Sequence, residues 1–185
     1  DHATAHWYRA EVLCWHALKL FKQINSNYGL AHTESHLGLL FTRQGKWEQA
    51  LTHLQRAKDI WQEMDDLHGL MQANLNLGSL YSDVSNFNKA IECLERALKY
   101  AMSAGETFEI GTIYMNLGNV YRRNQHPKQA IQLYQKAKPI FDQFANKDKL
   151  ALLKGNWGLS YVEQQMWNEA SEYLHAALAD WRALN

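Results

Sequence analysis

The sequence predicts an all-α fold, an α-solenoid in which antiparallel helix pairs stack one on the next. Three observations support this prediction: glycines recur every 40 residues, an aromatic residue follows each glycine by three positions, and alanines recur twice in each period. The first copy holds Gly38, Phe41, Ala50 and Ala57, and matching residues stand at 78, 81, 90 and 97, at 118, 121, 130 and 137, and at 158, 161, 170 and 177. Self-similarity at one fixed period is typical of arrays built from one supersecondary unit. Such an architecture favours binding over catalysis.

Each period is expected to hold two helices, which we call helix A and helix B. Apolar and small residues recur at helical spacing from Leu30 to Gly38, and again from Trp47 to Trp61. Gly45 lies between these segments, and glycine suits the left-handed residue that closes a helix. The later copies carry Ser85–Asn86, Gln125–His126 and Gln165–Met166 in the same turn.

The same register fits the start of the chain. Trp7, Ala10 and Ala17 stand one period before the matching residues of the first full copy, so the chain is expected to open on a helix B. The predicted organisation is a single array of about nine helices over residues 1–185. It consists of a half repeat at 1–30 and repeats at 31–70, 71–110, 111–150 and 151–185.

The last predicted helix has an apolar outer face. Leu174, Leu178 and Trp181 lie where another helix would stack, whereas the terminal repeats of complete solenoids have polar outer faces. The chain also starts at Asp1 rather than at a methionine. We therefore expect a longer parent protein, with end-to-end self-association as the alternative.

The repeated positions form the pattern of a known family. Leu-Gly-x-x-aromatic, followed by Ala, an apolar residue and a second Ala, resembles the tetratricopeptide repeat in all four copies, with Trp157 replacing one Leu. The family's usual period is about 34 residues. The longer period here is similar to that of kinesin light chains, of the spindle-orienting scaffold that binds G-protein α subunits, and of bacterial MalT-like regulators. The family's early tryptophan is replaced by Glu34, Asn74, Tyr114 and Lys154.

The resemblance implies a right-handed superhelix whose concave groove is lined by helices A. Two residues before each glycine stand His36, Asn76, Asn116 and Asn156. Their position resembles the asparagine ladder with which the O-linked N-acetylglucosamine transferase superhelix grips a peptide backbone. A carboxamide offers both donors and an acceptor, so it pairs with an amide of any sequence. The alternative is that these residues bond only to neighbouring helices or water.

Other groove positions are predicted from the same register. Ser79 and Asn119 lie one turn further along, and Leu75, Met115 and Leu159 suggest an apolar strip suited to an amphipathic helix or a side-chain pocket. Charges of alternating sign follow at Arg43, Asp83, Arg123 and Glu163. These charges either pair laterally with one another or form a rim that sets a partner's register.

Composition limits the classes of partner. Lys+Arg and Asp+Glu both total 19, so the net charge is zero and a basic footprint for nucleic acid or anionic membrane is lacking. No apolar stretch approaches the roughly 20 residues of a membrane helix, and no secretory signal opens the chain. Cys14 and Cys93 have no paired spacing and read as buried thiols of a reducing, cytoplasmic compartment. A disulfide or metal pair is the alternative.

No catalytic residue, metal site or cofactor is predicted. His32 and His36 lie four apart, but a zinc protease needs a glutamate directly after the first histidine, and Glu34 stands two residues along. We expect both histidines to line the groove, with adventitious metal binding as the alternative. His2 and His6 repeat the spacing near the chain end.

Two prolines fall in one predicted helix B. Pro127 stands at its start, where a missing N–H costs nothing. Pro139 lies inside the helix and predicts a local bend near residues 135–139, with a functional hinge as the alternative.

The function predicted from these features is a non-catalytic interaction module that binds a peptide or partner helix in its concave groove. The alternative is the effector-sensing arm of a MalT-like signalling or transcription regulator, which binds a small ligand. An enzyme, or a rigid spacer within one, is the third hypothesis. The partner is expected to be a protein or peptide rather than nucleic acid or membrane.

Overall fold

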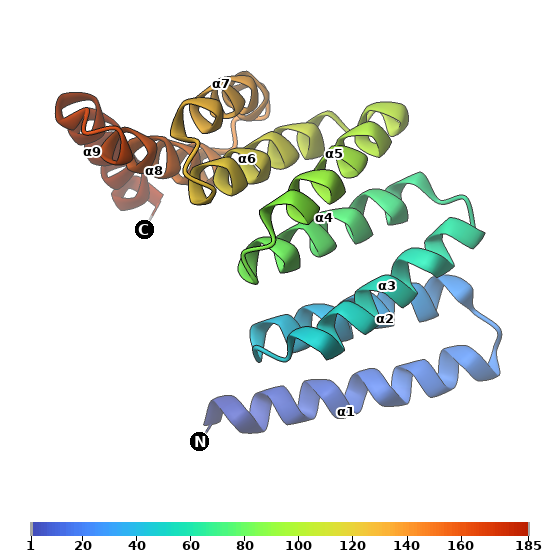
Figure 1. Cartoon of the computed structure of the whole chain (residues 1–185). Coiled ribbons are helices and arrows are strands. Elements are labelled where there is room, and N and C mark those ends of the chain that lie inside the picture. Colours follow the sequence, from blue (N-terminus) through green and yellow to red (C-terminus); the bar gives the residue numbers. More distant parts are fainter. Residues whose placement is uncertain (1, 185) are drawn as a thin grey trace. The chain divides into compact units, whose positions relative to one another are not determined.

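The computed structural model describes residues 2–184, with side chains from Trp7 onward. Over this range the chain is helical apart from the short turns between helices, and it contains no strand (Figure 1). The helices are α1 (His2–Gln23), α2 (Asn27–Arg43), α3 (Trp47–Glu63), α4 (Leu67–Asp83), α5 (Phe87–Ala104), α6 (Thr107–Arg123), α7 (Pro127–Gln143), α8 (Lys147–Glu163) and α9 (Trp167–Leu184). The even-numbered helices are the predicted helices A, and the odd-numbered ones are helices B. The all-α fold of stacked helix pairs is confirmed.

The chain forms two compact units, which we call unit 1 (residues 1–104) and unit 2 (residues 105–185). In unit 1 each helix from α1 to α5 packs on the next along the chain, and the two A helices α2 and α4 also touch. In unit 2 the same holds from α6 to α9, with α6 touching α8. Contact between successive A helices is what stacked repeats require. A single array over the whole chain stays a prediction.

The A helices begin slightly before the predicted repeat boundaries. Ser26 and Asp66 cap α2 and α4, because their side-chain oxygens accept the backbone N–H of Gly29 at 3.2 Å and of Gly69 at 2.8 Å. Asn146 caps α8 in the same way, at 2.9 Å from the N–H of Lys149. These capping residues and the first helical turn had been assigned to the end of the preceding repeat.

Each turn contains one residue in the left-handed region, which closes the preceding helix. Gly45 has a φ of 71°, as predicted, and the matching Ser85, Gln125 and Gln165 have φ values of 59°, 61° and 59°. The turns between repeats use Asn25, Asp65, Gly105 and Ala145 in the same way, at 52°, 53°, 72° and 49°. A left-handed residue therefore ends a helix every 20 residues along the chain.

The recurring aromatic residue takes part in these helix ends. Its carbonyl accepts the backbone N–H that follows the left-handed residue, as from Lys46 to Phe41 at 2.9 Å. This is the Schellman arrangement. The same bond is accepted by Phe21, Trp61, Tyr81, Tyr121, Phe141 and Tyr161. Ala101 stands at this position in α5, immediately before the division between the two units.

The recurring glycines allow helices A and B to pack closely. A Cβ built on Gly38, Gly78 or Gly158 would lie 2.5–2.7 Å from the side chain of Leu54, Leu94 or Leu174. On Gly118 it would lie 2.3 Å from the ring of Tyr134. The paired alanines are buried in all four copies. The predicted reason for these small residues, close approach of two helices, is confirmed.

The two prolines lie in α7. Pro127 is its first residue, as predicted. The helix continues through Pro139 to Gln143, and both Pro139 and Gln135, four residues earlier, are exposed. Solvent can therefore satisfy the carbonyl that proline leaves without a donor. The local bend and the hinge stay predictions.

Gly118→Ala is expected to lower the free energy of unfolding by about 1–3 kcal/mol, because Tyr134 is fully buried and its ring cannot move away from an added methyl group. Gly155→Ala on α8 is the matched control, since its Cβ would meet the nearest atom at an ordinary 3.6 Å. That variant should be neutral or gain up to about 1 kcal/mol from helix propensity. Urea unfolding measures both, and equal effects would contradict the close-packing account.

Candidate functional site

The predicted binding residues lie on the A helices of each unit. In unit 1, α2 carries His36 and α4 carries Asn76 and Ser79; His36 and Ser79 are exposed and Asn76 is half-buried. In unit 2, α6 carries Asn116 and Asn119 and α8 carries Asn156, all half-buried. Because α2 touches α4 and α6 touches α8, each unit presents these residues on two adjacent helices. We call these the A-helix surfaces of units 1 and 2.

The predicted apolar strip is wrong at two of its three positions. Leu75 and Met115 are only 7% and 3% exposed, and Met115 packs in the core of unit 2 with Tyr134, Leu153 and other residues. The physical reason is helical rotation, since a residue adjacent to the half-buried Asn76 or Asn116 is turned by about 100° around the helix. Leu159, which is 41% exposed, remains on the surface.

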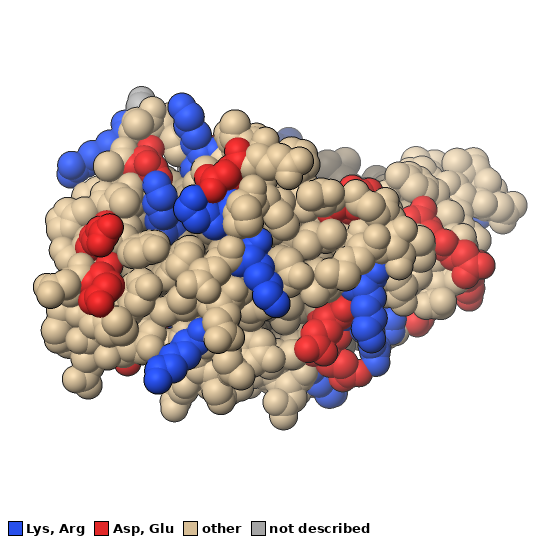
Figure 2. All heavy atoms as spheres, turned by 90° about the horizontal axis from the view of Figure 1, so that it is seen from above, with Lys and Arg blue, Asp and Glu red and all other residues tan. Residues whose placement is uncertain are grey.

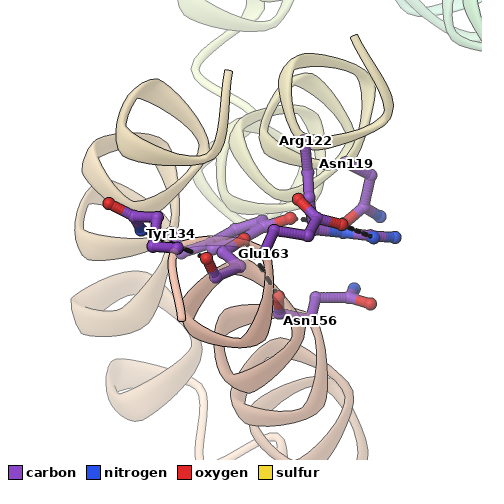
Figure 3. A network of polar contacts seen from close by, with 7 residues as sticks. Asn119, Arg122, Tyr134, Asn156 and Glu163 are labelled. Carbon is purple, nitrogen blue, oxygen red and sulfur yellow. Dashed lines mark hydrogen bonds and ion pairs between the residues drawn. The ribbon is translucent and has the colours of Figure 1, made fainter. Parts of the chain in front are cut away.

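A polar network connects the core of unit 2 to its A-helix surface (Figure 3). Tyr134 occupies the core position that leucine fills in the other repeats, and its side chain is fully buried. Its hydroxyl donates to the Oδ1 atom of Asn119 at 2.9 Å. Burial raises the pKa of Tyr134 to about 12. The side-chain oxygen of Asn119, a predicted binding residue, therefore accepts a hydrogen bond from within the protein.

An ion pair joins the two A helices of unit 2. Arg122 Nη1 lies 2.6 Å from Glu163 Oε1, while the Nε atom of Arg122 is buried and has no hydrogen-bond partner among the described residues. Glu163 thus pairs with Arg122 of the neighbouring repeat, whereas lateral pairing among Arg43, Asp83, Arg123 and Glu163 stays a prediction. Arg123 and Arg43 are exposed on α6 and α2.

Asn156 keeps its carboxamide outside this network. Its backbone oxygen accepts from Ser160 Oγ at 3.2 Å, and Figure 3 shows its amide group pointing away from the dashed contacts. A half-buried carboxamide with this orientation is accessible to a partner.

His32 of α2 packs among aromatic rings, and His36 is exposed. His32 makes edge-on contacts with Tyr28 and Trp61, at 4.5 and 5.0 Å between ring centroids. Burial lowers the pKa of His32, and His36 lowers it further. Among residues whose side chains are described, no three His, Cys, Asp or Glu groups converge on a metal site. The side chains of His2 and His6 lie outside the described residues.

A buried His–Glu pair was missed by the sequence analysis. Glu34 of α2 lies 2.5 Å from Nδ1 of His53 on α3, and both side chains are buried. Phe41 stacks on the His53 ring at 5.3 Å, and Trp15 meets it edge-on at 5.5 Å. The available signal was that Glu34 stands where the family has a large apolar residue.

Both cysteines are free thiols. Cys93 is buried and Cys14 is half-buried, so the expected burial holds in full only for Cys93. Burial raises the pKa of both thiols, which leaves them protonated and weakly nucleophilic near neutral pH.

The surface carries both signs of charge. Figure 2 shows one face on which basic and acidic side chains are interspersed.

None of the helices within residues 2–184 combines the length and the apolar character needed to cross a membrane. On α9, Leu174, Leu178 and Trp181 are 37–42% exposed, although Leu174 also packs against Gly158 of α8. Self-association through them stays a prediction.

Comparison with known proteins gives a family match and a set of structural neighbours. A family model described as tetratricopeptide repeat matches residues 29–103 and 69–143, which together make up more than half of the chain. No curated protein matches the chain in sequence.

Three solved structures illustrate the fold similarity. BtubC (BKLC) from P. vanneervenii has a TM-score of 0.86 and 19% identity, covering 100% of this chain and 76% of its own. A Rap protein complexed with competence and sporulation factor has a TM-score of 0.83 and 17% identity, covering 98% of this chain and 52% of its own. A STAND protein with a tetratricopeptide repeat sensor from Pyrococcus horikoshii has a TM-score of 0.78 and 18% identity, covering 91% and 27%. This chain thus spans about half of the Rap protein and about a quarter of the STAND protein, and at these identities the similarity establishes the fold alone.

Glu34→Leu is expected to destabilise the protein by about 1–3 kcal/mol, because it leaves a ring nitrogen of the buried His53 without its hydrogen-bond partner. The double variant Glu34→Leu with His53→Leu should be more stable than this single variant, since it buries no unpaired polar group. Urea unfolding measures both. A double variant that is less stable than the single one would contradict this account of the pair.

Stability should fall at alkaline pH because of Tyr134. Its pKa is near 12 in the folded protein and near 10 in the unfolded chain, so the folded state holds the proton more tightly. The stabilisation is complete below pH 10 and is lost as pH rises through 12, by up to about 2–3 kcal/mol. Unfolding curves between pH 9 and pH 12 should show a steeper loss for the wild type than for Tyr134→Phe. Parallel curves would refute the assignment.

Proposed function

Because the chain belongs to the tetratricopeptide repeat family, we propose that it is a non-catalytic protein-interaction module whose A-helix surfaces bind a peptide or partner helix. The observation that carries this proposal is the recurrence of half-buried carboxamides at one register: Asn76 in unit 1, and Asn116 and Asn156 in unit 2. Proteins of this family are typically scaffolds that bind other proteins, which supports a protein or peptide as the partner.

The chemistry of these positions suits an extended backbone. A carboxamide can donate to a peptide carbonyl and accept from a peptide N–H at once, whatever the peptide's sequence. His36 and Ser79 add further polar groups in unit 1, and Asn119 keeps its amide NH2 group for a partner in unit 2. The exposed Arg43 and Arg123 stand at the C-terminal ends of α2 and α6, where they favour acidic residues beside the bound segment.

The proposal assigns no catalytic group, cofactor or nucleic-acid partner. The balanced charge of the chain supports a protein partner, and its two free thiols support a cytoplasmic setting. A purely structural spacer is the outcome that remains if no partner binds.

The triple variant Asn76→Ala, Asn116→Ala and Asn156→Ala is expected to lose its partner while keeping its melting temperature. Each lost contact in a desolvated surface costs about 1–3 kcal/mol, so the three together should weaken binding by at least about 100-fold. The wild type and the variant are used as baits in lysate of the source cells, and the affinity of any retained protein is then measured by titration. The matched control is Asn88→Ala with Asn168→Ala, exposed asparagines on the B helices α5 and α9. A partner retained equally by all three baits would refute the A-helix surfaces as the site.

A second candidate is an effector-sensing arm that binds a small ligand. It is favoured by the fold similarity to a Rap protein solved with competence and sporulation factor and to a STAND protein with a repeat sensor. A ligand that binds the native state raises its stability by RT ln(1 + [L]/Kd). A thermal-shift screen over sugars, nucleotides and short peptides tests this candidate, and a flat screen would count against it.

A further inference from the structure

Unit 1 contains a pocket of about 150 Å³ between α3, α4 and α5, away from the A-helix surface. Its innermost residues are the buried Asn74, Leu77 and Cys93. We call it the Asn74 pocket. Asn74 and Asn76 both lie on α4, but residues two apart on a helix do not share a face. The pocket is therefore separate from the surface described under the proposed function.

The Asn74 side chain has one unpaired polar atom. The residue is 1% exposed and its Nδ2 donates to the carbonyl of Leu70 at 2.7 Å, but its Oδ1 is buried without a hydrogen-bond partner among the described residues. A buried acceptor without a donor is costly. At the same repeat position Glu34 pairs with His53 and Lys154 with Asp180. The side chains at the matching positions therefore have partners, whereas the oxygen of Asn74 has none among the described residues.

The rim of the pocket carries excess positive charge. Lys58 lies on α3, and Lys89, Glu92 and Arg96 lie on α5. Arg96 is paired with Glu92, and the ammonium of Lys89 lies over the ring of Tyr81, 5.3 Å from its centroid. All four charged groups act electrostatically on the Cys93 thiol, so they surround the same small space. Three cations against one carboxylate favour an anionic occupant.

Unit 2 has a pocket at the same repeat register, but its lining residues differ from those of the Asn74 pocket. It measures about 190 Å³ in unit 2 and is lined at the matching register by Lys138, Lys154, Trp157 and Glu172. There Lys138 pairs with Asp142 and Lys154 with Asp180, so the lysines are neutralised. Of these two pockets, only the Asn74 pocket combines an unpaired oxygen acceptor with an excess of positive charge.

The size and the unpaired oxygen narrow the class of occupant. The volume lies below the roughly 300–1,000 Å³ typical of small-molecule sites, so it suits a single side chain. A simple carboxylate would satisfy the cations but has no donor for Asn74, and a phosphate can offer only an O–H on the anion itself. An acidic residue within a peptide supplies both the carboxylate and a neighbouring backbone N–H.

We propose that the Asn74 pocket binds the acidic side chain of a peptide. The carboxylate lies among Lys58, Lys89 and Arg96, and a peptide N–H donates to Asn74 Oδ1. This gives the protein a second recognition site, on the side of the B helices, that is independent of the A-helix surfaces.

The test is an NMR titration of the full chain with N-acetyl-glutamate N-methylamide. The side-chain amide signals of Asn74 and the backbone amide of Cys93 should shift and saturate, and the neutral glutamine analogue should bind at least about tenfold more weakly. Acetate and inorganic phosphate should also bind at least tenfold more weakly than the glutamate compound. Equal binding of acetate or phosphate would reduce the site to a general anion site, and absence of any saturable shift would overturn the proposal.

Variants separate the two parts of the proposed contact. Lys58→Gln should weaken binding several-fold, whereas Lys138→Gln, its matched control in unit 2, should leave binding unchanged. Asn74→Leu should weaken binding at least about tenfold and raise the melting temperature, because it removes the unpaired oxygen. Unchanged affinity in Asn74→Leu, or equal losses in the two lysine variants, would refute the assignment. Because these readouts do not involve Asn76, Asn116 or Asn156, failure here is distinguishable from failure of the proposed function.

Discussion

The structure depends on the close contact of each A helix with the B helix that follows it. At Gly38, Gly78, Gly118 and Gly158 the A-helix backbone comes so near to a large B-helix side chain that no Cβ fits between them. This contact sets the spacing of the pair, and the buried alanines let the helices approach along their length. A residue in the left-handed region then ends each helix, so that the next helix can turn back along it. Stacking of successive A helices follows from this geometry.

One of these contacts in unit 2 has tyrosine in place of leucine, and this difference reaches the A-helix surface. Where the other repeats place leucine against the glycine, Tyr134 brings a hydroxyl group into the core, and a buried hydroxyl needs a partner. Asn119 supplies it, which connects a core position to a predicted binding residue. The Arg122–Glu163 pair beside it then ties α6 to α8. Two contacts thus connect the A-helix surface of unit 2 to its core and join its two A helices.

The position at which the family carries tryptophan gives each repeat its individual character. A large indole there would fill the space between a helix A and the B helices beside it. Glu34 instead forms a buried pair with His53, Lys154 reaches Asp180, and Asn74 leaves an oxygen unpaired next to a cationic pocket. Glu34, Asn74 and Lys154 thus place polar side chains where the family has tryptophan. Of these three, only Asn74 has a buried polar atom without a hydrogen-bond partner among the described residues.

Periodicity along the chain was enough to predict the helices, the left-handed residue Gly45 and the close glycine contacts, because each depends on residues that recur in register. The asparagines that it assigned to partner binding, Asn76, Asn116 and Asn156, are half-buried, and their role stays a prediction. Periodicity misjudged Leu75 and Met115, which are buried. It could not find the Glu34–His53 pair or the unpaired Asn74 oxygen. These depend on which side chains meet when separate helices pack. The sequence marks Glu34 as unusual for its position, but nothing in it marks His53, 19 positions away, as the partner.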